Sequence, residues 1–120
     1  MEEKTVLALG EAGVDTEAAL RRLGGNAALY EKILMKFLDD QSFSEIGPAL
    51  DQDDYETALK AAHTLKGVSA NLGMDRLADA CAEVVNHIRA NEPDPAKNAY
   101  PELEKAYRAV CMALANEENA

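Results

Sequence analysis

The chain has 120 residues and carries 12 basic against 22 acidic side chains, which gives a net charge of −10. This acidic balance disfavours nucleic acid as a partner, because such binding depends on lysine and arginine side chains that neutralise phosphates. No run approaches the roughly 18 apolar residues of a membrane span, and no signal-peptide pattern opens the chain. We therefore expect a cytoplasmic protein without membrane insertion.

The length suits one domain with its own hydrophobic core. We predict a single domain over 1–120, with a helical bundle at about 14–116 and ends at 1–10 and 117–120 that are able to fray. Cys81 and Cys111 are the only cysteines, and both fall on apolar helical faces outside any CxxC motif. They are interpreted as buried thiols in a reducing compartment.

The first elements are short. Residues 1–10 form either a loose lead-in or a short helix. Asp15 or Thr16 is a suitable N-cap for a short helix that runs to Leu23. Gly24-Gly25 then indicates a helix C-terminus.

A longer helix follows, with Asn26 as its N-cap. Its apolar residues recur at intervals of three and four, as expected for a helix with one buried face. They are Leu29, Tyr30, Ile33, Leu34, Phe37 and Leu38. Gly47-Pro48 interrupts this pattern, and it either kinks the helix or starts a new one with Pro48 at the first position.

The next helix follows an acidic connector, where Asp53 or Asp54 serves as the N-cap. At about 100° per residue its apolar side chains form one stripe, and His63 lies about 130° from the middle of that stripe. His63 should therefore face water. Gly73 ends this helix and allows a tight reversal. The apolar stripe of this helix consists of Ala58, Ala62, Leu65, Ser69 and Leu72.

Two further helices complete the prediction. One runs from about Met74 to Ala90 and has a clear apolar stripe. Residues 91–95 form a turn, and Pro101 suggests that the last helix begins near Tyr100. No segment has the pattern of a strand. The predicted fold is all-α, an antiparallel four-helix bundle with an additional short N-terminal helix.

His63, Lys66 and Gly67 share one patch of the helix surface, because residues three and four apart are neighbours there. Neutral imidazole can act as a nucleophile, and a nearby ammonium would stabilise the oxygens of a phosphoryl group bound to it. Gly67 leaves space for a second protein. The simpler alternative is a surface histidine beside a tolerated glycine, and short motifs alone do not exclude it.

The run AAHTLKGVSANLG resembles the signature of the histidine-containing phosphotransfer (HPt) domain. That pattern has a histidine, an apolar residue two positions later, Lys-Gly, and a second glycine. His63, Leu65, Lys66, Gly67 and Gly73 match it. The stretch LRRLGGNAALYEKILMKFLDD also resembles the entry to the first long helix of the family, and the likeness covers about 14–114.

The resemblance implies a phosphohistidine intermediate of a multistep two-component phosphorelay. His63 would accept a phosphoryl group, Lys66 would stabilise it, and Gly67 and Gly73 would give access. It also implies no kinase activity and no cofactor of its own, with Mg²⁺ on the partner. Those partners would be receiver domains of response regulators or hybrid histidine kinases.

Two other functions stay open. Chemotaxis-type histidine kinases begin with a similar helical domain that receives phosphate from ATP through a separate catalytic domain. The second alternative is a helical adaptor protein that is never phosphorylated. A metal site is not expected, because the spacing of His63 and His87 matches no metal-binding template.

Residues around His63 are candidates for partner docking. Leu59 and Ala70 flank the histidine on its own helix, and Leu20 would join them if the short N-terminal helix packs beside Leu59. The family often has a polar residue facing the histidine from the next helix. The counterpart here is Val85, with Asn86 as a substitute.

Overall fold

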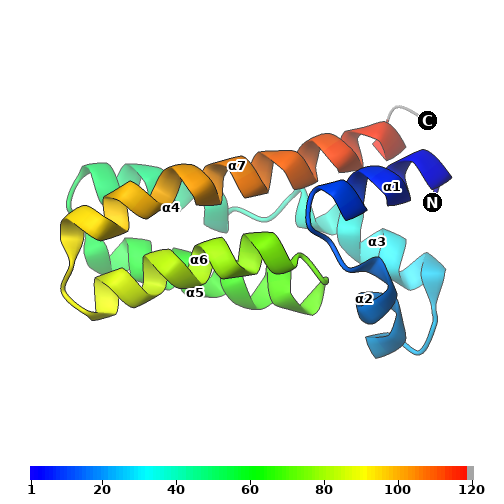
Figure 1. Cartoon of the computed structure of the whole chain (residues 1–120), viewed down its shortest axis with the longest axis horizontal. Coiled ribbons are helices and arrows are strands. Elements are labelled where there is room, and N and C mark those ends of the chain that lie inside the picture. The colour runs from blue at the N-terminus through cyan, green and yellow to red at the C-terminus, as the bar shows by residue number, and fades with distance from the viewer. Residues whose placement is uncertain (119–120) are drawn as a thin grey trace.

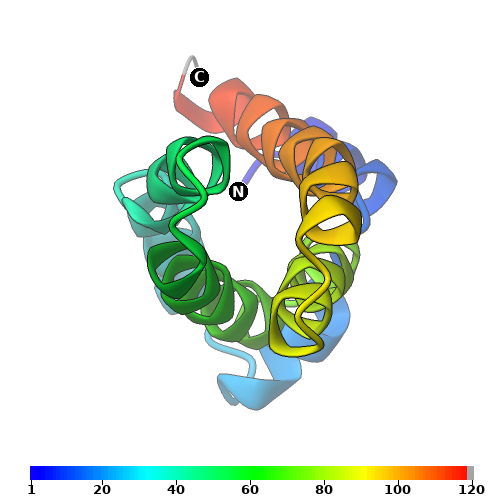
Figure 2. The same ribbon diagram turned by 90° about the vertical axis from the view of Figure 1, so that its left-hand side faces the viewer.

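The computed structural model describes residues 1–118, which contain seven helices and no strand. The bundle consists of α4 (Ser42–Asp51), α5 (Tyr55–Asn71), α6 (Asp75–Arg89) and α7 (Pro93–Glu118). Each helix packs against the next, and α4 also contacts α7, so that the four form the closed ring of Figure 2. This confirms the all-α bundle. None of the helices within residues 1–118 has the length and apolar character needed to cross a membrane.

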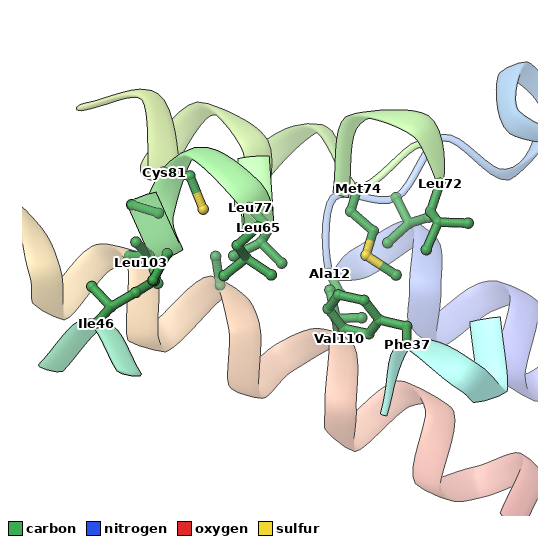
Figure 3. Close-up of a cluster of buried hydrophobic side chains, with 14 of the residues drawn as sticks. Ala12, Phe37, Ile46, Leu65, Leu72, Met74, Leu77, Cys81, Leu103 and Val110 are labelled. Carbon is green, nitrogen blue, oxygen red and sulfur yellow. The ribbon is translucent and has the colours of Figure 1, made fainter. Parts of the chain in front are cut away.

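The core fills the centre of this ring. Figure 3 shows Leu65 of α5 beside Leu77 of α6, with Leu103 of α7 in the same cluster, and all three are fully buried. Burying one such side chain stabilises the fold by about 1.5–3 kcal/mol. Ala58 and Ala62 are also fully buried on the inner face of α5, where their small size lets the neighbouring helices come close.

Three further helices lie at one end of the bundle (Figure 1). These are α1 (Glu3–Glu11), which packs along α7, and the short pair α2 (Thr16–Arg22) and α3 (Ala27–Phe37). The Asp15 carboxylate accepts a hydrogen bond from the Ala18 N–H at 3.0 Å, and the Asn26 side chain accepts one from the Leu29 N–H at 3.0 Å. The predicted cap Asn26 is confirmed, and of the two candidates for α2 the cap is Asp15.

The break in the predicted long helix lies earlier than expected. Helix α3 ends at Phe37, and the Asp40 carboxylate accepts a hydrogen bond from the Ser42 N–H at 2.8 Å where α4 begins. Pro48 lies inside α4, so it neither starts a helix nor marks the interruption. Burial of Ile46, Ala49 and Leu50 offsets the backbone hydrogen bond that proline cannot donate.

The last helix also begins earlier than predicted. Pro93 opens α7 and Pro101 lies within it, so the predicted turn at 91–95 and the start near Tyr100 are wrong. Asn91, with φ 58°, makes the reversal instead. Proline is favoured in a first helical turn, where no N–H partner is needed. Buried Ala96 anchors the segment that precedes Pro101.

The N-terminal helix and the end of α7 are held together. The Glu117 carboxylate accepts hydrogen bonds from the Glu2 N–H at 3.1 Å and from the hydroxyl of buried Thr5 at 2.9 Å. Of the two alternatives for the first ten residues, the short helix is correct, because residues 3–10 belong to α1. Glu117 likewise belongs to α7. The remainder of the tail predicted to fray, 119–120, lies outside the described residues.

The cysteines do not pair with each other as a disulfide. Cys81 is fully buried, as predicted, whereas Cys111 is only half-buried, so the prediction of two buried thiols is correct for one of them. Burial raises the pKa of the Cys81 thiol to about 12, which keeps it protonated and unreactive.

Candidate functional site

Helix α5 presents His63 on its outer face. The helix begins after Asp54, whose carboxylate accepts a hydrogen bond from the Thr57 N–H at 3.1 Å, so Asp54 is the cap. The predicted stripe of Ala58, Ala62, Leu65, Ser69 and Leu72 is buried, and Ala61 joins it. His63 is exposed, as its helical phase predicts.

Lys66 and Gly67 occupy the next turn of the same surface. Gly67 is exposed and Lys66 is half-buried. The Lys66 ammonium lowers the pKa of the Cys81 thiol and so counters part of the effect of burial. Lys66 therefore lies close enough to α6 for its charge to act on Cys81.

The His63 ring has no hydrogen bond or ion pair with any other residue of 1–118. Val85, at the position expected to face the histidine, is fully buried and apolar. Asn86 is exposed, and it does not bond to the ring. Both ring nitrogens of His63 are thus open to an incoming molecule.

The two glycines of the motif have different surroundings. A Cβ atom at Gly67 would meet nothing within 4 Å, so the space outside the helix there is open. Gly73 is buried with φ +77°, and a Cβ atom there would collide with the carbonyl oxygen of Asp15. Gly73 serves the predicted chain reversal and also the close contact with the start of α2, but because it is buried it does not have the predicted role in access.

The C-terminal end of α5 is held by α2 and α3. The Arg22 guanidinium donates hydrogen bonds to the carbonyl oxygens of Ala70 at 2.9 Å and Asn71 at 3.3 Å. The Tyr30 hydroxyl donates to the carbonyl oxygen of Leu72 at 2.9 Å. These bonds satisfy carbonyl groups that a helix end leaves without partners.

Sequence reasoning missed both of these contacts. It placed Tyr30 on an apolar face. A buried tyrosine hydroxyl needs a hydrogen-bond partner, and this need was the signal that could have revealed the contact. Burial raises the pKa of Tyr30 to about 12. No local pattern pointed to Arg22, because its partners lie 48 and 49 residues away.

The candidate docking residues are spread along the molecule. Leu59 is half-buried on the same side of α5 as Lys66, and Ala70 is exposed near the end of the helix. Leu20 lines a hollow of about 460 Å³ with Glu17, Arg21, Gly24 and Gly25. Because α2 packs at the C-terminal end of α5, Leu20 does not pack beside Leu59, which lies about 16 Å from Ala70 along the helix axis.

The second histidine has a structural role. Nδ1 of His87 lies 2.9 Å from a carboxylate oxygen of Glu92, and Nε2 lies 3.6 Å from one of Glu83. Glu83 is on the same helix, whereas Glu92 immediately precedes α7. His87 thus connects the end of α6 to the start of α7.

Comparison with known proteins identifies the family of this site. The model of the Hpt domain matches residues 33–113, which contain α4, α5 and α6 completely and most of α7. No curated protein and no solved structure matches the chain. Hpt domains are phosphotransfer modules of two-component signalling that interact with receiver domains and are not in general kinases. Because the match covers more than half of the chain, including the whole helix that carries His63, this protein belongs to the Hpt domain family.

Proposed function

We propose that His63 is the phosphoacceptor and that the protein is the phosphohistidine intermediate of a multistep cytoplasmic phosphorelay. The unprotonated ring nitrogen attacks the phosphorus of an aspartyl phosphate on one receiver domain. An N–P bond forms while the bond from phosphorus to the aspartyl oxygen breaks and releases the carboxylate. Attack by the aspartate of a second receiver domain then reverses this step and passes the phosphoryl group on.

The observation that carries this proposal is the outward position of an unbonded His63. Phosphoryl transfer depends mainly on in-line positioning and charge stabilisation, so the nucleophile must reach into a site on another protein. A convex helix surface suits that approach. The open space outside Gly67 would let the partner backbone come close to the ring.

Lys66 supplies the charge that stabilises the phosphoryl group in this proposal. Its ammonium would pair with the oxygens of the phosphoryl group once the N–P bond forms. The Mg²⁺ ion and most catalytic groups would belong to the receiver domain, so that this chain needs no cofactor of its own. Leu59 and Ala70 are proposed as docking residues on the helix of the histidine, and Leu20 as a separate one on α2, at the C-terminal end of α5.

The proposal is tested with receiver domains of the source organism, each loaded with radiolabelled phosphate. The wild-type protein should take the label from at least one receiver, and His63→Gln should take none. His87→Gln is the matched control, because it removes the other histidine of the chain and should still accept the label. The adduct should be labile in acid and stable in base, as phosphohistidine is.

The same experiment separates the other two functions. Labelling that requires ATP and a histidine-kinase catalytic core, and fails with every receiver, would indicate the phosphoacceptor domain of a chemotaxis-type kinase. If neither donor labels the wild-type protein and His63→Gln preserves partner signalling, the protein is a helical adaptor. A label on His63→Gln would show that another residue is the acceptor.

A further inference from the structure

His63 lies between two lysines, one turn away in each direction. Lys60 precedes it by three residues and Lys66 follows it by three, so they fall about 60° to either side of it around the helix axis. The two lysines differ in environment. Lys66 is half-buried near Cys81 of α6, whereas Lys60 is exposed on the opposite flank.

This surface is locally positive in a strongly acidic protein. Residues 57–74 contain no aspartate or glutamate, although the whole chain has 22 acidic residues. Glu56 stands four residues before Lys60, yet no ion pair joins them, and Lys60 forms no salt bridge within residues 1–118. The neighbouring helices carry exposed acids, among them Glu83 of α6 and Glu45 of α4, but none belongs to this segment of α5.

We propose that Lys60 is a docking residue that recognises carboxylates around the phosphorylation site of the receiver domain. This inference rests on the proposed function. A partner that presents an aspartate and holds Mg²⁺ must gather oxygen ligands, mainly carboxylates, at that point. When this site closes over His63, those carboxylates meet the positive flank of α5, whereas the chain as a whole, with a net charge of −10, repels them.

The two lysines therefore act on different steps. Lys66 is half-buried and its charge acts on Cys81 of α6, so burial limits its motion and its ammonium would be positioned for the phosphoryl group in the reacting complex. Lys60 has no such support, and holding it in one geometry would cost side-chain entropy. A mobile, exposed charge instead raises the rate at which the receiver domain associates, because charges at the rim of an interface chiefly change the association rate and its dependence on salt.

The test uses a receiver domain phosphorylated with acetyl phosphate and the full chain, with transfer rates measured over a range of receiver concentrations. Lys60→Glu should raise KM about tenfold at low ionic strength and leave kcat within about twofold. Raising the salt concentration should shrink the difference from the wild type, because screening weakens exposed charges. Lys66→Ala should instead lower kcat.

Lys105→Glu is the matched control, since it makes the same change of charge at an exposed position of α7. Figure 2 shows α7 diagonally across the ring from α5. The proposal is overturned if Lys60→Glu and Lys105→Glu change KM equally, or if Lys60→Glu lowers kcat at saturating receiver. The nucleophile is tested separately: phosphoramidate should phosphorylate the wild-type protein at His63 and should not phosphorylate His63→Gln. Failure of the docking proposal would therefore leave the phosphoacceptor proposal standing.

Discussion

The hydroxyl of Tyr30 donates a hydrogen bond of 2.9 Å to the carbonyl oxygen of Leu72, and so joins α3 to the residue that ends α5. Tyr30 is only 2 % exposed, so water cannot replace this partner. Tyr30→Phe should destabilise the fold by about 1–2 kcal/mol, because the carbonyl group stays buried without its donor. Chemical denaturation measures the change.

Tyr55→Phe is the control for this substitution. It removes an exposed hydroxyl that donates to Asp53 at 3.0 Å, and it should cost less than about 0.5 kcal/mol. The pH dependence gives a second check. The pKa of Tyr30 is raised from 10.0 to about 12 in the folded protein, so its contribution to stability is complete below pH 10 and is lost as the pH rises through about 12. Tyr30→Phe should lose less stability over that range than the wild type.

Lys66→Ala should slow phosphoryl transfer in both directions while the fold is retained, because the phosphoryl oxygens lose the cation proposed to pair with them. Lys66→Arg keeps the charge and should restore part of the rate. Rapid-quench measurements of transfer at saturating receiver concentration detect the effect. Transfer by Lys66→Ala at the wild-type rate would exclude the proposed role.

The two motif glycines should respond oppositely to alanine. Gly67→Ala should stabilise the protein by about 0.5–1 kcal/mol, since the site is helical and the added methyl group meets open space. Gly73→Ala should destabilise it by more than about 1 kcal/mol, because the φ of +77° is unfavourable for alanine and the Asp15 carbonyl oxygen blocks the added group. Thermal denaturation compares the two.

Gly67 also permits a test of access to His63. Gly67→Gln should remain folded yet impair phosphoryl transfer, because the longer side chain fills the space that a partner would use. Chemical phosphorylation by phosphoramidate, a small donor, should be little affected in the same variant. An equal loss of phosphorylation with the receiver domain and with phosphoramidate would mean that the substitution disturbs His63 itself.

Leu59→Asp should weaken receiver binding more than folding, because Leu59 is half-buried at the edge of the bundle. Leu7→Asp makes the same change at a side chain of α1 that is 63 % exposed, and it should leave binding unchanged. Calorimetric titration with a receiver domain measures the affinities. Unfolding of Leu59→Asp would assign Leu59 to the core, and Leu20→Asp tests the hollow on α2 separately.

Glu117→Gln should loosen α1 at neutral pH. The N–H of Glu2 and the hydroxyl of Thr5 hold the pKa of this carboxyl below its usual range. A lowered pKa means that the contribution to stability is complete above the ordinary glutamate value and is lost as the pH falls through the lower, folded value. The difference in Tm between the wild type and Glu117→Gln should therefore shrink in acid.

Much of this fold follows from local features of the chain. Asp15, Asn26 and Asp54 cap helices by binding an N–H group three residues later, so each signal and its effect lie in one short segment. The exposure of His63 follows equally from the apolar period of its own helix. Local hydrogen bonding and helical phase do not depend on the rest of the structure, and the sequence alone therefore determined them.

Only the tertiary structure decided the remaining features. Pro48 and Pro101 lie inside helices because burial against neighbouring helices outweighs the hydrogen bond that each proline omits. The close approach of the Asp15 carbonyl oxygen to Gly73, and the hydrogen bonds of Arg22 at the end of α5, join residues that are far apart in the chain. Such contacts form only when packing brings distant segments together, and no periodicity within one segment contains that information.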